Sequence, residues 1–134
     1  IKMIPSARIA KQIEPDGSEP FELVRTKSWG YSLLNLEALV QLAQLGEKFG
    51  IDLWTYSTTD GRSIRKVIDW LLPYAIGEKE WKHPQIVPME KERIYPILQI
   101  ASVKYKDSKY LGAAKRIPGI DVTHLRTNLY LPKF

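Results

Sequence analysis

Residues 32–49 form the strongest periodic pattern of the sequence. Polar side chains recur at helical spacing along one narrow stripe, and apolar side chains cover most of the remaining circumference; the polar positions are Glu37, Gln41, Gln44 and Lys48. A helix that is apolar over so much of its surface is packed on more than one side. Gly50 follows where a left-handed residue commonly ends a helix. The pattern therefore predicts a long core helix.

A second amphipathic pattern covers residues 64–75. Its apolar side chains fall on one face of a helix, namely Ile64, Val67, Ile68, Leu71, Leu72 and Ala75. Asp60 is predicted to cap the N-terminus of this helix, and Pro73 is predicted to end or kink it. We expect Arg62 and Arg65 on a solvated face, with contact to a polyanion as the alternative.

The remaining segments favour the same structural class. Helical patterns cover residues 2–13, 89–105, 108–117 and 122–128, and residues 78–88 are predicted to form a long ordered loop. Pro96 predicts a bend in the helix over residues 89–105. Because no run of residues alternates as a strand would, we predict an all-α fold of antiparallel helical hairpins, in one domain over residues 1–134.

The charge balance favours an anionic partner. Lysine and arginine number 20 against 15 acidic residues, which gives a net charge of +5. Nucleic acid, an acidic polysaccharide and an anionic membrane surface would all suit such a surplus. No basic recognition helix or dense cationic run supports nucleic acid, so we expect no nucleic-acid partner. No apolar run approaches the ~20 residues of a membrane span, so we expect no membrane partner.

Several kinds of reactive site are absent from the sequence. The chain has no cysteine, which excludes a thiolate nucleophile and a disulfide framework. Its two histidines, His83 and His124, lie far apart and lack the spacing of metal ligands. No glycine-rich phosphate loop is present. We therefore expect neither a metal nor a cofactor.

Residues 25–35 concentrate polar and aromatic chemistry directly before the core helix. The segment holds Arg25, Lys27, Trp29, Tyr31 and Asn35 within eleven residues. One interpretation is a helix entry, with Ser32 as its cap and the two aromatic residues in the core. The other is a functional site, in which cations and an amide surround a tyrosine.

This segment also carries a family resemblance. Residues 14–39 read EPDGSEPFELVRTKSWGYSLLNLEAL and resemble the corresponding segment of the alginate lyase family. Matches continue in order at residues 52–54, 60–64 and 72–74 and at Trp81. The resemblance covers residues from about 8 to 110. It implies part of an (α/α) toroid and a lyase that cleaves an anionic, uronate-containing polysaccharide such as alginate by β-elimination.

The resemblance also implies roles for individual residues. Tyr31 matches the family's catalytic tyrosine, which serves as base, acid or both. A phenol ionises in water only near pH ~10, so it needs a neighbouring positive charge. Arg25 is the candidate for that charge or for binding the carboxylate, with Lys27 as the alternative. The other predicted substrate contacts are Trp29, Asn35, Trp54 and Trp81.

One element of the family's site is missing from the sequence. The family uses an Asn-His pair on an earlier helix to neutralise the carboxylate, and this sequence contains no such pair. We therefore expect the chain to be the C-terminal part of a longer enzyme, with a companion N-terminal segment that completes the toroid. A non-catalytic carbohydrate-binding module and an inactive lyase fragment are the alternatives. The substrate class implies a secreted or periplasmic protein.

Overall fold

The computed structural model describes residues 2–121, 123 and 126–132. Within these ranges the secondary structure is helical and contains no strand, only an isolated bridge between Lys27 and Gln85. The prediction of an all-α fold is confirmed. No described helix has the length and apolar character that a membrane crossing requires.

The chain divides into two compact units. The first comprises Ile1–Leu71 and Lys82–Met89, and the second comprises Leu72–Trp81 and Glu90–Phe134. The expectation of one domain over residues 1–134 stays a prediction, because the contacts define each unit and not the arrangement between them.

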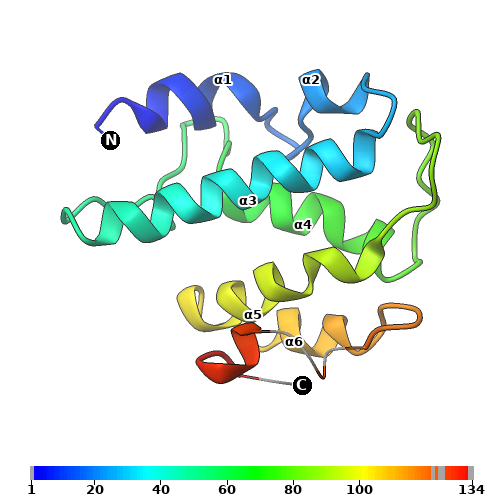
Figure 1. Cartoon of the computed structure of the whole chain (residues 1–134). Coiled ribbons are helices and arrows are strands. Elements are labelled where there is room, and N and C mark those ends of the chain that lie inside the picture. The colour runs from blue at the N-terminus through cyan, green and yellow to red at the C-terminus, as the bar shows by residue number, and fades with distance from the viewer. Residues whose placement is uncertain (1, 122, 124–125, 133–134) are drawn as a thin grey trace. The chain divides into compact units, whose positions relative to one another are not determined.

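The first unit holds the longest helix of the described chain. Its elements are η1 (Pro5–Ile9), α1 (Ala10–Gln12), α2 (Pro20–Leu23), α3 (Ser28–Glu47) and the first two turns of α4 (Ile64–Ala75). The helices η1 and α1 run on from one another, and α2 packs against α3 (Figure 1). Leu33, Leu36 and Leu39 of α3 are fully buried. Gly50 has the predicted left-handed backbone, with φ of 69°.

The start of α3 differs from the prediction. The helix begins at Ser28, so Ser32 lies inside it and does not cap it. The loop after α4 instead accepts hydrogen bonds from amide groups in the first turn of α3. Ser28 donates its amide and hydroxyl hydrogens to the carbonyl oxygen of Pro84, and the Trp29 amide donates to Gln85 Oε1 over 3.0 Å. Amide groups of a first helical turn need such outside partners. This contact, which the sequence does not reveal, moves the helix start by one turn.

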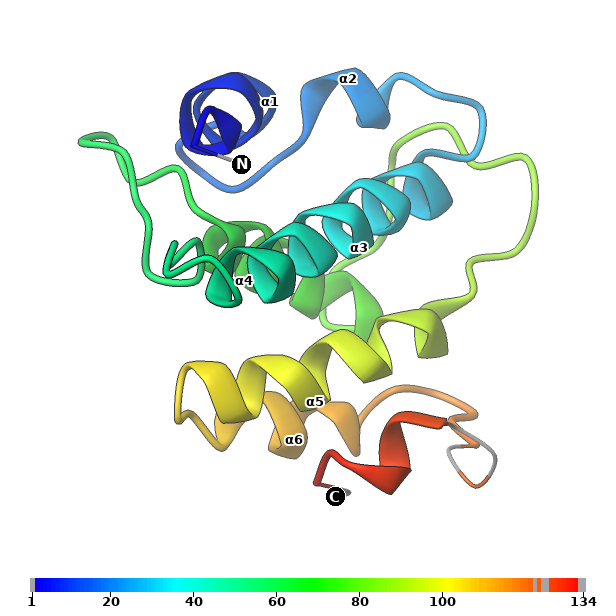
Figure 2. The same cartoon turned by 60° about the vertical axis from the view of Figure 1, so that its left-hand side comes forward.

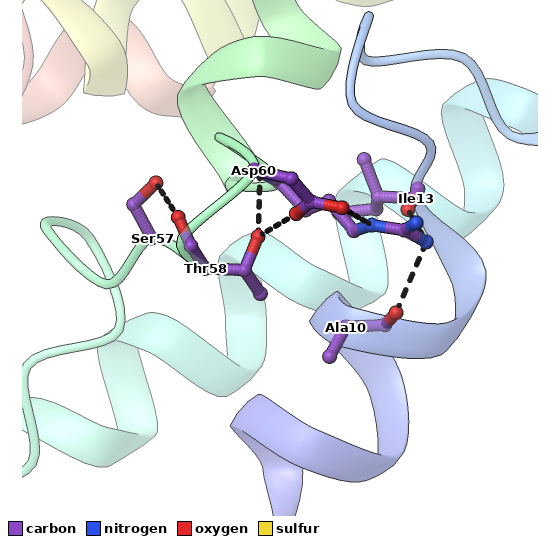
Figure 3. A network of polar contacts seen from close by, with 6 residues as sticks. Ala10, Ile13, Ser57, Thr58 and Asp60 are labelled. Carbon is purple, nitrogen blue, oxygen red and sulfur yellow. Dashed lines mark hydrogen bonds and ion pairs between the residues drawn. The ribbon is translucent and has the colours of Figure 1, made fainter.

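The cap of α4 also differs from the prediction. Ser63, rather than Asp60, accepts a hydrogen bond from the Lys66 amide, over 3.1 Å. Asp60 accepts hydrogen bonds from Thr58 Oγ1 and Arg62 Nε (Figure 3). Of the six residues predicted to form the apolar face of this helix, Leu72 is half-buried and five are fully buried, namely Ile64, Val67, Ile68, Leu71 and Ala75.

Arg62 joins this loop to α1. Its Nη1 donates to the carbonyl oxygens of Ala10, over 3.2 Å, and Ile13, over 3.0 Å (Figure 3). Its side chain is only 23% exposed. The expectation that Arg62 lies on a solvated face is therefore wrong, and the alternative of a polyanion contact stays a prediction. The guanidinium satisfies carbonyl groups at the end of α1, which lack partners within the helix.

The second unit contains a helical hairpin. Its elements are the end of α4, η2 (Lys91–Ile94), α5 (Tyr95–Lys104), α6 (Lys109–Ala114) and η3 (Arg126–Leu129), and α5 packs against α6 (Figure 2). Pro96 lies in the first turn of α5. The predicted bend is wrong, since a first-turn proline lacks only an amide hydrogen that has no partner within the helix. Within the predicted segment 122–128, Val122, His124 and Leu125 lie outside the described residues.

Candidate functional site

A cavity of about 410 Å³ opens in the first unit beside α3. Four of its lining residues come from α3 at helical spacing, and three come from η1, α2 and the segment after α2; they are Tyr31, Leu34, Asn35, Ala38, Arg8, Glu22 and Arg25. Residues three and four positions apart share one face of a helix. The volume falls within the ~300–1,000 Å³ of small-molecule sites.

The structure brings Arg25 and Tyr31 together. The guanidinium carbon of Arg25 lies 3.7 Å from the centroid of the Tyr31 ring, which is a cation–π contact. Arg25 Nη1 also lies 3.7 Å from a carboxylate oxygen of Glu22. Within the described chain the Tyr31 hydroxyl has no hydrogen-bond partner, so it is available to a ligand.

Asn35 links two further residues at this site. Its Oδ1 accepts a hydrogen bond from Arg8 Nη2 over 3.4 Å, and its Nδ2 donates to Glu19 Oε1 over 2.7 Å. Arg8 Nε is buried and has no partner among the described residues. Arg8 therefore reaches the cavity with most of its donor capacity unused.

Glu19, which accepts the hydrogen bond from Asn35, is only 2% exposed. Its Oε2 is buried and finds no partner in the part of the chain that the structure describes. Burial raises the pKa of Glu19 to about 8, against the opposing hydrogen bond from Asn35, and the nearby charge of Glu22 raises it further. A buried carboxyl that lacks partners is more stable when it is neutral.

The charges around the cavity favour an anion. Arg8 and Arg25 carry two positive charges against the single negative charge of Glu22, and Glu19 is mainly neutral near pH 7. The balance is one net positive charge at an open, partly apolar site. Arginine donors in fork geometry match carboxylate oxygens well.

The comparisons with known proteins identify the family. The family model described as alginate lyase matches residues 1–81, more than half of the chain. The chain belongs to the alginate lyase family. A crystal structure of an alginate lyase from Bacteroides ovatus matches with a TM-score of 0.82 and 31% sequence identity. This match covers 90% of our chain and 32% of that one, so the chain spans about a third of that protein's length. A search of the curated proteins found no match.

Three other residues that were predicted to contact substrate lie in the first unit, namely Lys27, Trp29 and Trp54. Trp29 is 1% exposed and Trp54 is 4% exposed, so both rings are core residues. The prediction that they stack on sugar is wrong, because a sugar ring needs an accessible aromatic face. Lys27 is exposed at the residue before α3, where its backbone bridges to Gln85, and it does not line the cavity.

The last predicted contact, Trp81, belongs to the second unit. Its ring is half-buried and meets the Tyr74 ring edge-on at 5.1 Å between centroids. Its predicted contact with substrate stays a prediction. Among the described residues no cluster of histidine and carboxylate side chains could hold a metal ion.

The sequence pattern did not indicate Arg8, Glu19 or Glu22 as site residues. Arg8 lies 27 positions from its partner Asn35, and no periodic pattern links residues so far apart. Glu22 had one local signal, since it lies three positions before Arg25 and pairs with it. Glu19 gave no signal, because a glutamate beside a proline in a polar loop is ordinarily solvated.

Proposed function

We propose that this chain carries part of the active site of a polysaccharide lyase. Its substrate is an anionic, uronate-containing polysaccharide such as alginate, which it cleaves by β-elimination. Tyr31 serves as base and acid, and Arg25 stabilises negative charge. The observation that carries the proposal is a tyrosine whose hydroxyl has no partner among the described residues, at an open cavity that two arginines also line, in a member of the alginate lyase family.

The chemistry makes three demands on such a site. The proton on the carbon next to the uronate carboxylate is very weakly acidic while that carboxylate keeps its charge. Cationic and amide donors must therefore neutralise the carboxylate as negative charge builds on it. A base removes the proton, the electron pair forms a carbon–carbon double bond, and the linked sugar oxygen leaves with a proton from an acid.

The cavity supplies a candidate for each demand. Arg8 and Arg25 offer guanidinium groups to the carboxylate, and Tyr31 offers a hydroxyl on the same face of α3 as Asn35. Leu34 and Ala38 add an apolar patch against which one face of a sugar ring can pack. The cavity thus combines charge neutralisation, proton transfer and ring placement in one unit of the chain.

We further propose that this chain acts together with a companion segment. The chain spans about a third of the Bacteroides ovatus protein, and its sequence holds no Asn-His pair. A companion N-terminal segment that supplies this pair would complete an (α/α) toroid and the neutralisation of the carboxylate. Because polyuronates occur outside the cytoplasm, such an enzyme would be secreted or periplasmic.

A non-catalytic carbohydrate-binding module is the second candidate, and the missing Asn-His pair favours it. Replacement Tyr31→Phe separates the two, because it removes only the hydroxyl. For a lyase we expect turnover to fall by ~10²–10⁴-fold with little change in affinity, the usual share of an acid–base group. For a module neither turnover nor affinity would depend on that hydroxyl.

The experiment measures the ultraviolet absorbance of the unsaturated product over alginate and other polyuronates. Tyr56→Phe is the matched control, since Tyr56 is half-buried in the loop before α4 and does not line the cavity. Turnover that Tyr31→Phe abolishes and Tyr56→Phe preserves would support the lyase. Polyuronate binding by the wild-type chain with no turnover, even when the companion N-terminal segment is supplied, would favour the module. Salt-resistant binding of duplex DNA would contradict both.

A further inference from the structure

Glu19 carries a buried carboxyl group next to the proposed site. It is the residue before α2, and its carbonyl oxygen accepts the amides of Glu22 and Leu23 over 2.9 and 3.1 Å. Its carboxyl group is buried, does not line the cavity, and accepts a hydrogen bond from the cavity residue Asn35. The mechanism proposed above gives this carboxyl group no part.

The three side chains form a directed chain of hydrogen bonds. An arginine has only donors, so Asn35 must turn its carbonyl oxygen to Arg8 and its amide to Glu19 Oε1. This assigns the orientation of the Asn35 amide from the chemistry of its partners. The carboxyl group of Glu19 therefore fixes Asn35, and Asn35 in turn fixes Arg8 at the cavity.

We propose that Glu19 is a positioning residue that holds Asn35 and Arg8 for the binding of an anionic sugar, and that only its neutral form leaves the site open to that sugar. This inference rests on the proposed function. It adds a residue that touches no substrate and acts through the hydrogen bonds of Asn35.

The charge around the cavity gives the physical reason. With Glu19 neutral, the two arginines outweigh Glu22 by one charge; with Glu19 ionised, the positive and negative charges are equal. An ionised Glu19 would also compete with the substrate carboxylate for Arg8, whose buried Nε has no partner in the described chain.

The groups around Glu19 support a change of charge in an accessible pH range. Burial raises its pKa to about 8, the hydrogen bond from Asn35 works against this, and Glu22 of α2 adds to it. Arg8 of η1 contacts it only through Asn35, and no ion pair joins Arg8 or Arg25 to it within the described residues. Among the residues of α3 that line the cavity, Tyr31 is the one with a titratable side chain.

The test measures binding of an alginate-derived hexasaccharide to the chain by calorimetry between pH 6 and pH 9.5. For the wild type we expect affinity to fall on the order of tenfold as Glu19 ionises, a size set by one added charge near the site. Glu19→Gln copies the neutral acid, since its amide oxygen still accepts from Asn35. It should bind like the wild type at pH 6 and keep that affinity at pH 9.

Glu19→Leu removes the acceptor and should weaken binding at every pH. A carbon-13 titration of the glutamate carboxyl groups in the unliganded chain provides a readout that needs no ligand. An alkaline loss of affinity that persists in Glu19→Gln, or a Glu19 that titrates near its usual 4.5, would overturn the inference and leave the proposed function intact. No binding by the wild type at any pH would overturn both.

Discussion

Gly17 holds the loop between α1 and α2 against α4, two residues before Glu19. Its φ of 97° lies in the left-handed region, and its amide donates to the carbonyl oxygen of Glu14 over 2.9 Å. A β-carbon at this position would overlap the carbonyl oxygen of Lys66 and lie 2.7 Å from the carbonyl carbon. Glycine is therefore required here for two separate reasons, the backbone conformation and the close approach of α4.

The cost of Gly17→Ala follows from both reasons. The left-handed backbone costs an alanine ~1–2 kcal/mol. The overlap involves backbone atoms of α4, which cannot rotate away, and overpacking of this kind costs a further ~1–3 kcal/mol. We expect the free energy of unfolding to fall by ~2–5 kcal/mol, a large part of the ~5–15 kcal/mol typical of a domain.

Gly61→Ala separates the two contributions. Gly61 has a similar φ of 90°, but a β-carbon there would meet no atom of the described residues within 4 Å. Urea denaturation followed by tryptophan fluorescence should therefore show a loss of only ~1–2 kcal/mol for this control. Equal losses for Gly17→Ala and Gly61→Ala would refute the contact with α4 as the reason for the glycine.

Three further predictions concern stability. Arg62→Ala removes charged hydrogen bonds to Ala10 and Ile13 and should lower the free energy of unfolding by ~2–3 kcal/mol. Arg62→Lys should recover only part of this loss, because lysine lacks the forked guanidinium group. Wild-type stability of Arg62→Ala in urea would contradict this role. Trp54→Phe should lower the free energy of unfolding by ~1–3 kcal/mol in the same assay and leave oligosaccharide affinity unchanged. A loss of affinity without a loss of stability would restore the predicted contact between Trp54 and sugar. The folded chain raises the pKa of Glu19 from 4.5 to about 8. The stabilising contribution of this residue is therefore complete below pH 4.5 and is lost as the pH rises through 8. The free energy of unfolding of the wild type relative to Glu19→Gln should fall over this range, and a constant difference would contradict the prediction.

The sequence predicted what local periodicity controls. The buried face of α4 follows from apolar residues three and four positions apart. The left-handed Gly50 follows from its place after a helix. These features depend on neighbours within a few positions, so one sequence is enough to predict them.

Other features depend on contacts between distant segments. The start of α3 is set by Pro84 and Gln85, which lie 56 positions from the residues that they contact. Trp54 was predicted to contact substrate, and the packing of the first unit shows that it is buried. Arg8 reaches Asn35 by the same kind of contact. Periodicity contains no information about such pairs, so the residues around Tyr31 could be predicted only in part.

The most direct test of the central claim is a crystal structure of the Tyr31→Phe variant with a bound uronate oligosaccharide. We predict a uronate carboxylate within hydrogen-bond distance of Arg8 or Arg25, with the adjacent carbon facing the ring of residue 31. A sugar bound elsewhere in the first unit, or a carboxylate turned away from both arginines, would contradict the claim that this cavity is the site of elimination.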